Sequence, residues 1–85
     1  MTVVTMFARP GCHLCDEARA QILALRAELP PYELRDVDIE ADEKLHASLL
    51  ERIPVVEVDG EVVSELALDR QAFARAVAAG YPAAS

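Results

Sequence analysis

Residues 6–15 read MFARPGCHLC, and within this stretch a strand pattern gives way to a helix pattern. The run Thr2–Phe7 is apolar, β-branched and aromatic, which predicts a buried strand that ends at the arginine, proline and glycine after it. Two cysteines, Cys12 and Cys15, follow where the chain turns from loop to helix. The stretch therefore predicts a strand, a tight loop and a helix that opens on a Cys-x-x-Cys pair.

The position of Cys12 at a helix start favours its ionised form. A helix N-terminus carries unpaired amides and a partial positive charge, and both stabilise a thiolate. Arg9 and a protonated His13 act in the same direction. Residues three apart in a helix have Cα atoms about 5 Å apart, inside the range of roughly 4.4 to 6.8 Å that a disulfide tolerates. Cys12 and Cys15 can therefore bond without a change of fold.

A disulfide between these two cysteines is a weak structural crosslink. The chain-entropy relation gives about 2 kcal/mol for so short a loop, against roughly 3 kcal/mol for a loop of fifteen residues. Small secreted scaffolds usually spread several bridges across the chain, whereas this sequence has one short pair. The pair therefore points to redox or metal chemistry.

The strongest helix pattern runs from the cysteines to Pro30 and Pro31, which end it. Its apolar side chains recur at steps of three and four, which places them on one face. They are Leu14, Ala18, Ile22, Leu25 and Leu29. Between the cysteines, Leu14 is thus expected to pack in the helix face rather than to serve recognition. Residues 32–39 then alternate as a strand does, but the alternation slips at Asp36, which predicts a local irregularity.

The second half of the chain begins with a short helix pattern and a hairpin. Apolar residues at steps of four predict a mostly exposed helix that starts near Ala41 and ends near Glu51. Residues 54–58 and 61–64 flank Asp59-Gly60, which is the two-residue signal for a tight turn between antiparallel strands.

The final pattern predicts a helix capped by Asp69, with Gly80 at a left-handed C-terminus. Its face toward the sheet is expected to carry Phe73, Ala76 and Val77. The element order is thus β-α-β-α-β-β-α, because the first long helix can cross over between two parallel strands. We expect one α/β domain over residues 1–85, with a four-stranded mixed sheet flanked by three helices.

Composition excludes several classes of function. The chain has 85 residues, 53% of them hydrophobic and 27% charged, and its net charge is -7. That sign is wrong for binding nucleic acid or an anionic membrane surface. No uncharged run approaches the roughly 18 residues of a membrane span, and charge and proline come too early for a secretory signal. We expect a cytoplasmic monomer.

With these patterns established, the chain resembles the glutaredoxin branch of the thioredoxin superfamily. The resemblance rests on MFARPGCHLC and on Arg52-Ile53-Pro54-Val55-Val56, which is similar to the Thr-Val-Pro segment of that fold. It covers essentially the whole chain and implies a thioredoxin-like, glutaredoxin-type fold. It also implies that Cys12 attacks, that Cys15 resolves, and that Pro54 is a cis-proline beside which a partner docks.

The sequence departs from the glutaredoxin pattern at three places. The Gly-Gly-x-Asp-Asp stretch that holds glutathione is replaced by Val63–Asp69, which lacks the double glycine. Arg52 stands in place of threonine, and His13-Leu14 stands between the cysteines in place of Pro-Tyr. We therefore expect thiol/disulfide chemistry with only weak coupling to glutathione.

These residues predict an enzyme, a dithiol thiol/disulfide oxidoreductase of cell redox homeostasis that reduces protein or glutathione mixed disulfides. The expected partners are disulfide-containing proteins and a thiol reductant, either glutathione or thioredoxin reductase, with no bound cofactor and no metal. The catalytic residues are Cys12 and Cys15, and the expected substrate-binding residues are Arg9, His13, Arg52, Ile53 and Pro54. Arg9 and Arg52 have a second interpretation as solubilising charges.

A non-catalytic interpretation stays open beside the enzyme. In it, the same fold is an adaptor that binds an iron-sulfur cluster or another metal, or that senses oxidation through its cysteines. A structural zinc site normally needs four protein ligands, and His13 and His46 are the only histidines that could join the two cysteines.

Overall fold

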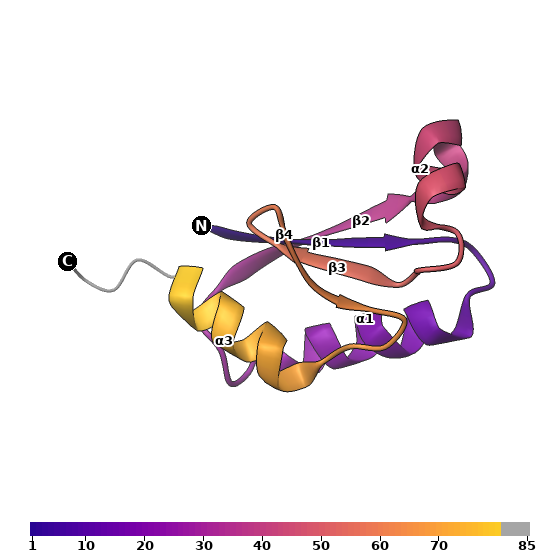
Figure 1. Cartoon of the computed structure of the whole chain (residues 1–85). Coiled ribbons are helices and arrows are strands. Elements are labelled where there is room, and N and C mark those ends of the chain that lie inside the picture. Colours follow the sequence, from indigo (N-terminus) through magenta and orange to yellow (C-terminus); the bar gives the residue numbers. More distant parts are fainter. Residues whose placement is uncertain (81–85) are drawn as a thin grey trace.

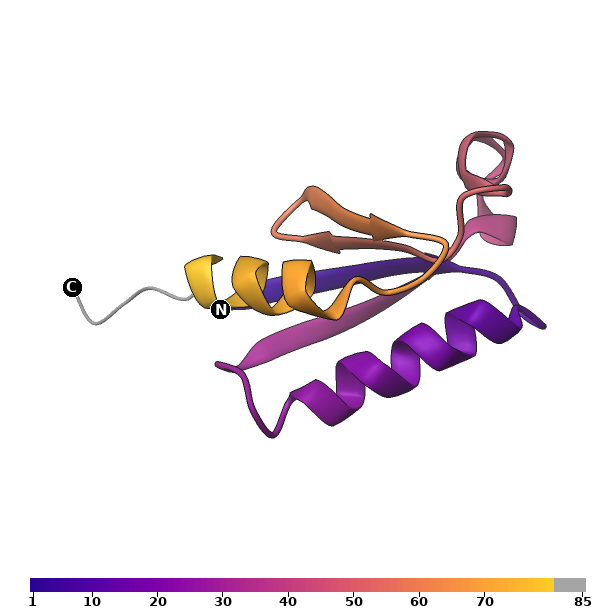
Figure 2. The same ribbon diagram turned by 60° about the horizontal axis from the view of Figure 1, so that its bottom comes forward.

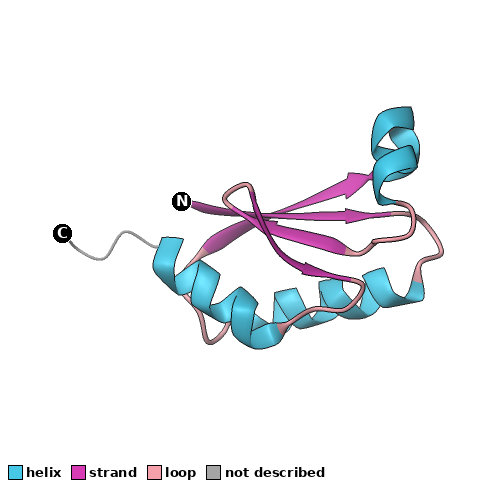
Figure 3. Ribbon diagram, viewed as in Figure 1, coloured by secondary structure: helices cyan, strands magenta, loops and turns pink. Residues whose placement is uncertain are grey.

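A computed structural model describes residues 1–80, and the last five residues of the expected domain, 81–85, lie outside it. The elements follow the predicted order (Figures 1 and 3). They are β1 (Thr2–Ala8), α1 (His13–Leu25), β2 (Tyr32–Asp38), the 3-10 turn η1 (Ile39–Ala41), α2 (Glu43–Leu49), β3 (Val55–Val58), β4 (Glu61–Glu65) and α3 (Arg70–Gly80). The predicted thioredoxin-like α/β fold is confirmed.

The four strands form one mixed sheet in the order β2-β1-β3-β4. β1 is parallel to β2 because α1 crosses over between them, and it is antiparallel to β3. The hairpin turn joins β3 to β4, with Asp59 and Gly60 at φ values of 50° and 88°. Two positive φ values in succession match the right-handed twist of the flanking strands, as the dipeptide predicts.

The core lies between one face of the sheet and the helices α1 and α3, which both cover that face (Figure 2). Alternate residues of β1 point into it, and Val4 and Met6 are fully buried. Phe73 and Val77 bury the inner face of α3 as predicted. The short helix α2 stands apart at the end of the sheet and contributes no buried residue, in agreement with the prediction of an exposed helix.

The predicted irregularity at Asp36 is wrong. β1 and β2 pair in unbroken register from Thr2 with Tyr32 to Ala8 with Asp38. Asp36 holds its regular place in the alternation because Arg19 of α1 reaches across to pair with it. The register irregularity of the sheet lies between β3 and β4, beside Val56 and Glu57.

The buried face of α1 also differs from the prediction at both ends. Its buried residues are Cys15, Ala18, Ile22 and Leu25. Leu14 is instead 46% exposed, so the expectation that it packs in the helix face is wrong. At the N-terminal end of α1 the buried face therefore begins at Cys15 instead of Leu14.

α1 ends at Leu25, earlier than the proline pair that was expected to end it. The amide of Arg26 donates to the carbonyl of Leu23, so the carbonyl of Ile22 does not receive its usual helical partner. The hydroxyl of Tyr32 donates to the Ile22 carbonyl instead. Leu29 lies beyond the end of α1, in a bend.

The two later helices begin at aspartate caps. The carboxylate of Asp42 accepts from the amides of Lys44 and Leu45, so α2 begins at Glu43 and Ala41 falls in the preceding 3-10 turn. Asp69 caps α3 as predicted and accepts from the amide of Ala72. Each cap fixes the helix start because it satisfies an amide that has no partner within the helix.

The prediction of a left-handed Gly80 is wrong, because Gly80 is the last helical residue of α3 and lacks a positive φ. A Cβ at this position would lie 2.7 Å from a carboxylate oxygen of Asp59 and 3.5 Å from Thr2 Oγ1. The glycine therefore serves close packing against the hairpin. Within residues 1–80, none of the helices has the length and apolar character needed to cross a membrane.

Candidate redox site

The loop between β1 and α1 is a tight turn that aims Cys12 at the helix start. Pro10 and Gly11 occupy its two central positions, Gly11 has φ 78°, and the amide of Cys12 donates to the carbonyl of Arg9 at 3.3 Å. Proline followed by a residue with positive φ is the signature of a type II turn. The residues that end the strand in the sequence thus also position the first sulfur.

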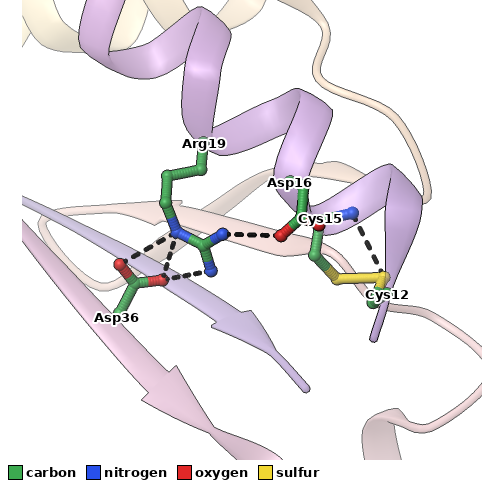
Figure 4. A network of polar contacts seen from close by, with 5 residues as sticks. All are labelled: Cys12, Cys15, Asp16, Arg19 and Asp36. Carbon is green, nitrogen blue, oxygen red and sulfur yellow. Dashed lines mark hydrogen bonds and ion pairs between the residues drawn. A yellow bond between two sulfur atoms is a disulfide. The ribbon is translucent and has the colours of Figure 1, made fainter. Parts of the chain in front are cut away.

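Cys12 is the N-cap of α1 (Figure 4). Its Sγ accepts a hydrogen bond from the amide of Cys15 at 3.1 Å, so the sulfur faces the unpaired amides of the first turn. These amides favour a negative charge on the sulfur when the pair is reduced. The predicted location of Cys12 is therefore found, with the helix amide itself as the donor.

Cys12 and Cys15 form a disulfide, with Cα atoms 5.2 Å apart. The two sulfurs differ in access, because Cys12 is half-buried while Cys15 is fully buried. A partner can therefore approach Cys12 and not Cys15. This difference fits the predicted division between an attacking and a resolving cysteine.

The segment that carries Pro54 lies at the same end of the sheet as the cysteine loop. Phe7 of β1 is paired with Val55 of β3, so the residues just after β1 and just before β3 leave the sheet side by side. The peptide bond between Ile53 and Pro54 is cis, and both side chains are buried. The amide of Ile53 donates to the carbonyl of Leu49 at 3.1 Å. The two buried side chains and the engaged Ile53 amide are therefore not open to a partner.

The residue after β4 holds the proline segment in place. The amide of Leu66 lies 3.1 Å from the carbonyl of Arg52 and 3.0 Å from that of Pro54. The guanidinium of Arg52 donates to the carboxylate of Glu65, the last residue of β4. This hydrogen bond and the charge of Arg52 keep the pKa of Glu65 below its ordinary value. Arg52 is thus turned toward β4.

Leu66 adopts φ 68° and is 52% exposed. It lies in the stretch where the glutaredoxin pattern has a double glycine, and glycine is the residue that reaches positive φ most readily. The left-handed backbone is therefore present here without glycine. No signal in the sequence indicates it, because leucine rarely adopts this conformation.

The other two predicted binding residues are also engaged with carboxylates. Arg9 lies 3.9 Å from Glu40, and His13 lies 3.2 Å from Glu17 with 85% of its side chain exposed. Both residues stand beside Cys12 in the chain. The Arg9 guanidinium faces an acid of η1, and the His13 imidazole faces an acid of α1.

A charge network that the sequence did not reveal lies next to the cysteines, further along α1 (Figure 4). Arg19 donates to both carboxylate oxygens of Asp36 at 2.9 to 3.2 Å and to Asp16 at 3.0 Å. The hydrogen bond with Asp36 raises the pKa of Arg19 despite partial desolvation. The spacing of Asp16 and Arg19 on one helix face is readable in the sequence. The part played by Asp36 is not, because it depends on the pairing of β2 with β1.

The described residues do not resemble a metal centre. Across residues 1–80, no group of three or more His, Cys, Asp or Glu side chains is arranged to hold a metal ion. His46 lies on α2, next to the acids Glu40 and Glu43. The two histidines considered as zinc ligands therefore do not form a ready-made site with the cysteines.

Comparison with known proteins adds a family to this geometry. A family model described as "Glutaredoxin-like domain (DUF836)" matches residues 3–78. The solution NMR structure of protein Ne2328 from Nitrosomonas europaea superimposes with a TM-score of 0.79, at 24% sequence identity, over 89% of this chain and 91% of that one. At this identity the structural match supports the fold alone. A search of curated proteins gave no significant match.

Proposed function

We propose, from the premise that this chain belongs to the glutaredoxin-like domain family (DUF836), that it is a dithiol thiol/disulfide oxidoreductase. One observation carries the proposal above all: a half-buried Cys12 at the cap of α1 is bonded to a fully buried Cys15. Cys12, the more accessible of the two, can exchange with a partner, and the buried Cys15 is placed to complete the exchange.

In the reduced protein the reaction begins at Cys12. Its thiolate attacks one sulfur of the partner disulfide, which forms a mixed disulfide and releases the other partner sulfur as a thiolate that takes up a proton. Cys15 then loses its proton and attacks the sulfur of Cys12, which releases the second partner thiol. The partner gains two electrons and the protein loses two, ending in the disulfide form.

Three features of this chain support these steps. The amide of Cys15 stabilises the Cys12 thiolate that makes the first attack. The Cα separation of 5.2 Å lets the second attack proceed without movement of α1. The segment with Pro54 borders the site, where a partner backbone is proposed to dock.

A thiol reductant completes the cycle by returning two electrons to the disulfide. Two molecules of glutathione or one turnover of thioredoxin reductase supplies them, and we propose weak coupling to glutathione. The proposed setting is the cytoplasm, whose reductants keep thiols reduced. We propose that the protein works as a monomer with no resident cofactor.

Cysteine variants test the function directly. Cys12→Ser is expected to abolish reduction of a model protein disulfide, because no exposed thiolate remains. Cys15→Ser is expected to keep partial activity on a glutathionylated substrate, where external glutathione can resolve the mixed disulfide. Full activity of Cys12→Ser would refute the proposal. A stoichiometric, chelator-removable metal in freshly purified protein would favour the metal-binding alternative instead.

A further inference from the structure

We infer that the partners of Cys12 are proteins whose reactive disulfide is flanked by positively charged and apolar side chains. The inference rests on the proposed redox function and specifies its substrate class. It sets the preferred partner apart from glutathione, which carries two carboxylates and one ammonium group.

The first line of support is the state of the basic side chains around the site. Residues 9–19 and 50–54, which surround the cysteines and Pro54, carry four basic side chains, and each of them lies against a carboxylate. The pairs are Arg9 with Glu40, His13 with Glu17, Arg19 with Asp16 and Asp36, and Arg52 with Glu65. The charge of each arginine is therefore already offset by a carboxylate, which weakens its attraction for an anionic partner.

The balance of charge at the site is also negative. The ion pairs contain five carboxylates against three arginines, so two negative charges are left over when His13 is neutral. The whole chain has the same sign, with a net charge of -7. A positively charged partner is therefore drawn toward this end of the molecule, while an acidic one is repelled.

The second line of support is apolar and independent of charge. Leu14, between the cysteines, is 46% exposed, and Leu66, whose amide binds the Pro54 segment, is 52% exposed. One exposed leucine thus stands between the two cysteines at the start of α1, and the other follows β4 and is bonded to the proline segment. Together they offer apolar contact to a side chain next to the partner's disulfide.

Leu66 combines exposure with an unfavourable backbone. At φ 68° Leu66 lies in the left-handed region, which is unfavourable for leucine. Burial of its side chain does not offset this cost, because half of the side chain faces solvent. Strained conformations of this kind concentrate at functional sites, where the surrounding structure holds them. We infer that the exposed side chain of Leu66 serves to contact a partner.

Three cyclic peptides with the same disulfide test the charge preference, with lysine, glutamine or glutamate at the flanking positions. The pre-reduced protein is mixed with each peptide, and the second-order rate constant is measured at several salt concentrations. We expect the lysine peptide to react about ten-fold faster than the glutamate peptide at low salt, a gap that narrows as salt screens the charges. Equal rates, or a faster glutamate peptide, would overturn the inference.

The same assay separates failure of the inference from failure of the proposed function. If none of the three peptides is reduced faster by the wild type than by Cys12→Ser, the redox function itself is wrong. If all are reduced at one rate through Cys12, the function stands and the charge preference falls.

Charge variants locate the preference on the molecule. Glu17→Gln combined with Glu65→Gln removes two negative charges near the cysteines and is expected to shrink the lysine preference by about three-fold or more. The matched control combines Glu28→Gln with Glu61→Gln, which remove the same charge beyond the end of α1 and at the hairpin. The control is expected to keep the wild-type preference, and an equal loss in both would show that only net charge matters.

The apolar contact needs its own variant. Leu66→Asn removes the apolar side chain and introduces a residue that tolerates positive φ. We expect it to slow reduction of a peptide with leucine beside the disulfide by about three-fold, and to leave a peptide with serine there unchanged. Val62→Thr alters an equally exposed apolar residue on β4 and serves as the control. Equal slowing of both peptides by Leu66→Asn would overturn the apolar part of the inference.

Discussion

Arg19 of α1 forms a bidentate contact with Asp36 of β2. Its Nε lies 3.1 and 3.2 Å from the two carboxylate oxygens, and its Nη2 lies 2.9 Å from one of them. This contact ties the helix that carries the cysteines to the edge strand of the sheet. The guanidinium of Arg19 also donates to Asp16, which lies one helical turn after Cys12.

Loss of the Arg19 contact is expected to destabilise the domain. Arg19→Gln should lower the free energy of unfolding by about 1 kcal/mol, the upper end for a surface pair, because the contact is bidentate and shared by two acids. Chemical denaturation measures it. Arg35→Gln is the control, since Arg35 pairs with Glu33 along one exposed strand and should change little. An equal loss in both variants would contradict the special role of Arg19.

Tyr32 is expected to stabilise the domain at neutral pH. Tyr32→Phe leaves the Ile22 carbonyl without its partner, which should cost about 1–2 kcal/mol. Thermal or chemical unfolding of the variant at neutral pH measures this loss.

Burial raises the pKa of Tyr32 above its ordinary value of 10.0. The unfolded state therefore gives up the phenol proton first, so the contribution of Tyr32 is complete below pH 10 and is lost as the pH rises further. The stability difference between wild type and Tyr32→Phe should shrink as the pH passes above 10. A difference that stays constant to pH 11 would contradict this account.

The contact of Arg52 with Glu65 should be visible in a titration. The pKa of Glu65 lies below its ordinary value of 4.5, first because of the hydrogen bond from Arg52 and then because of its charge. NMR of the side-chain carboxyl carbon is expected to give a midpoint below 4.5 in the wild type and near 4.5 in Arg52→Gln. Any stability from the pair is present above pH 4.5 and is lost as the pH falls through the lowered value. Identical midpoints in the two proteins would contradict the contact.

Substitution of Gly11 is expected to be limited by its backbone conformation and not by the space around it. A Cβ at this position meets no atom within 4 Å, so the whole cost of Gly11→Ala comes from φ 78°. We expect a loss of about 1 kcal/mol for alanine and less for asparagine, which adopts positive φ more easily. Urea denaturation of the disulfide form compares the two. Equal stability of wild type and Gly11→Ala would show that the turn adapts.

Much of this fold was predictable because its signals are local. The turn before Cys12, the Asp59-Gly60 hairpin and the Asp69 cap each depend on a few adjacent residues with restricted backbone choices. The cysteine pair was predictable for the same reason. Each of these signals acts within one turn of the chain.

The errors fall where residues distant in sequence decide the outcome. Asp36 looks like a break in strand periodicity until Arg19, 17 residues earlier, is placed opposite it. Gly80 looks like a helix terminator, but its lack of a side chain lets α3 approach Asp59. Leu66 carries no sequence signal for its left-handed backbone, which Arg52 and Pro54 fix through their carbonyls. In each case tertiary contacts override local preference.

The unequal exposure of the two sulfurs has a practical consequence for chemical labelling. Cys15 is fully buried while Cys12 is half-buried, so a bulky maleimide added to the reduced, folded protein should modify one thiol per molecule. The second thiol should become available only after denaturation. Mass spectrometry of the tagged protein thus distinguishes folded molecules, with one tag, from unfolded molecules, with two. In the Cys15→Ser variant the resolving thiol is missing, so a partner protein stays covalently attached to Cys12 and can be identified.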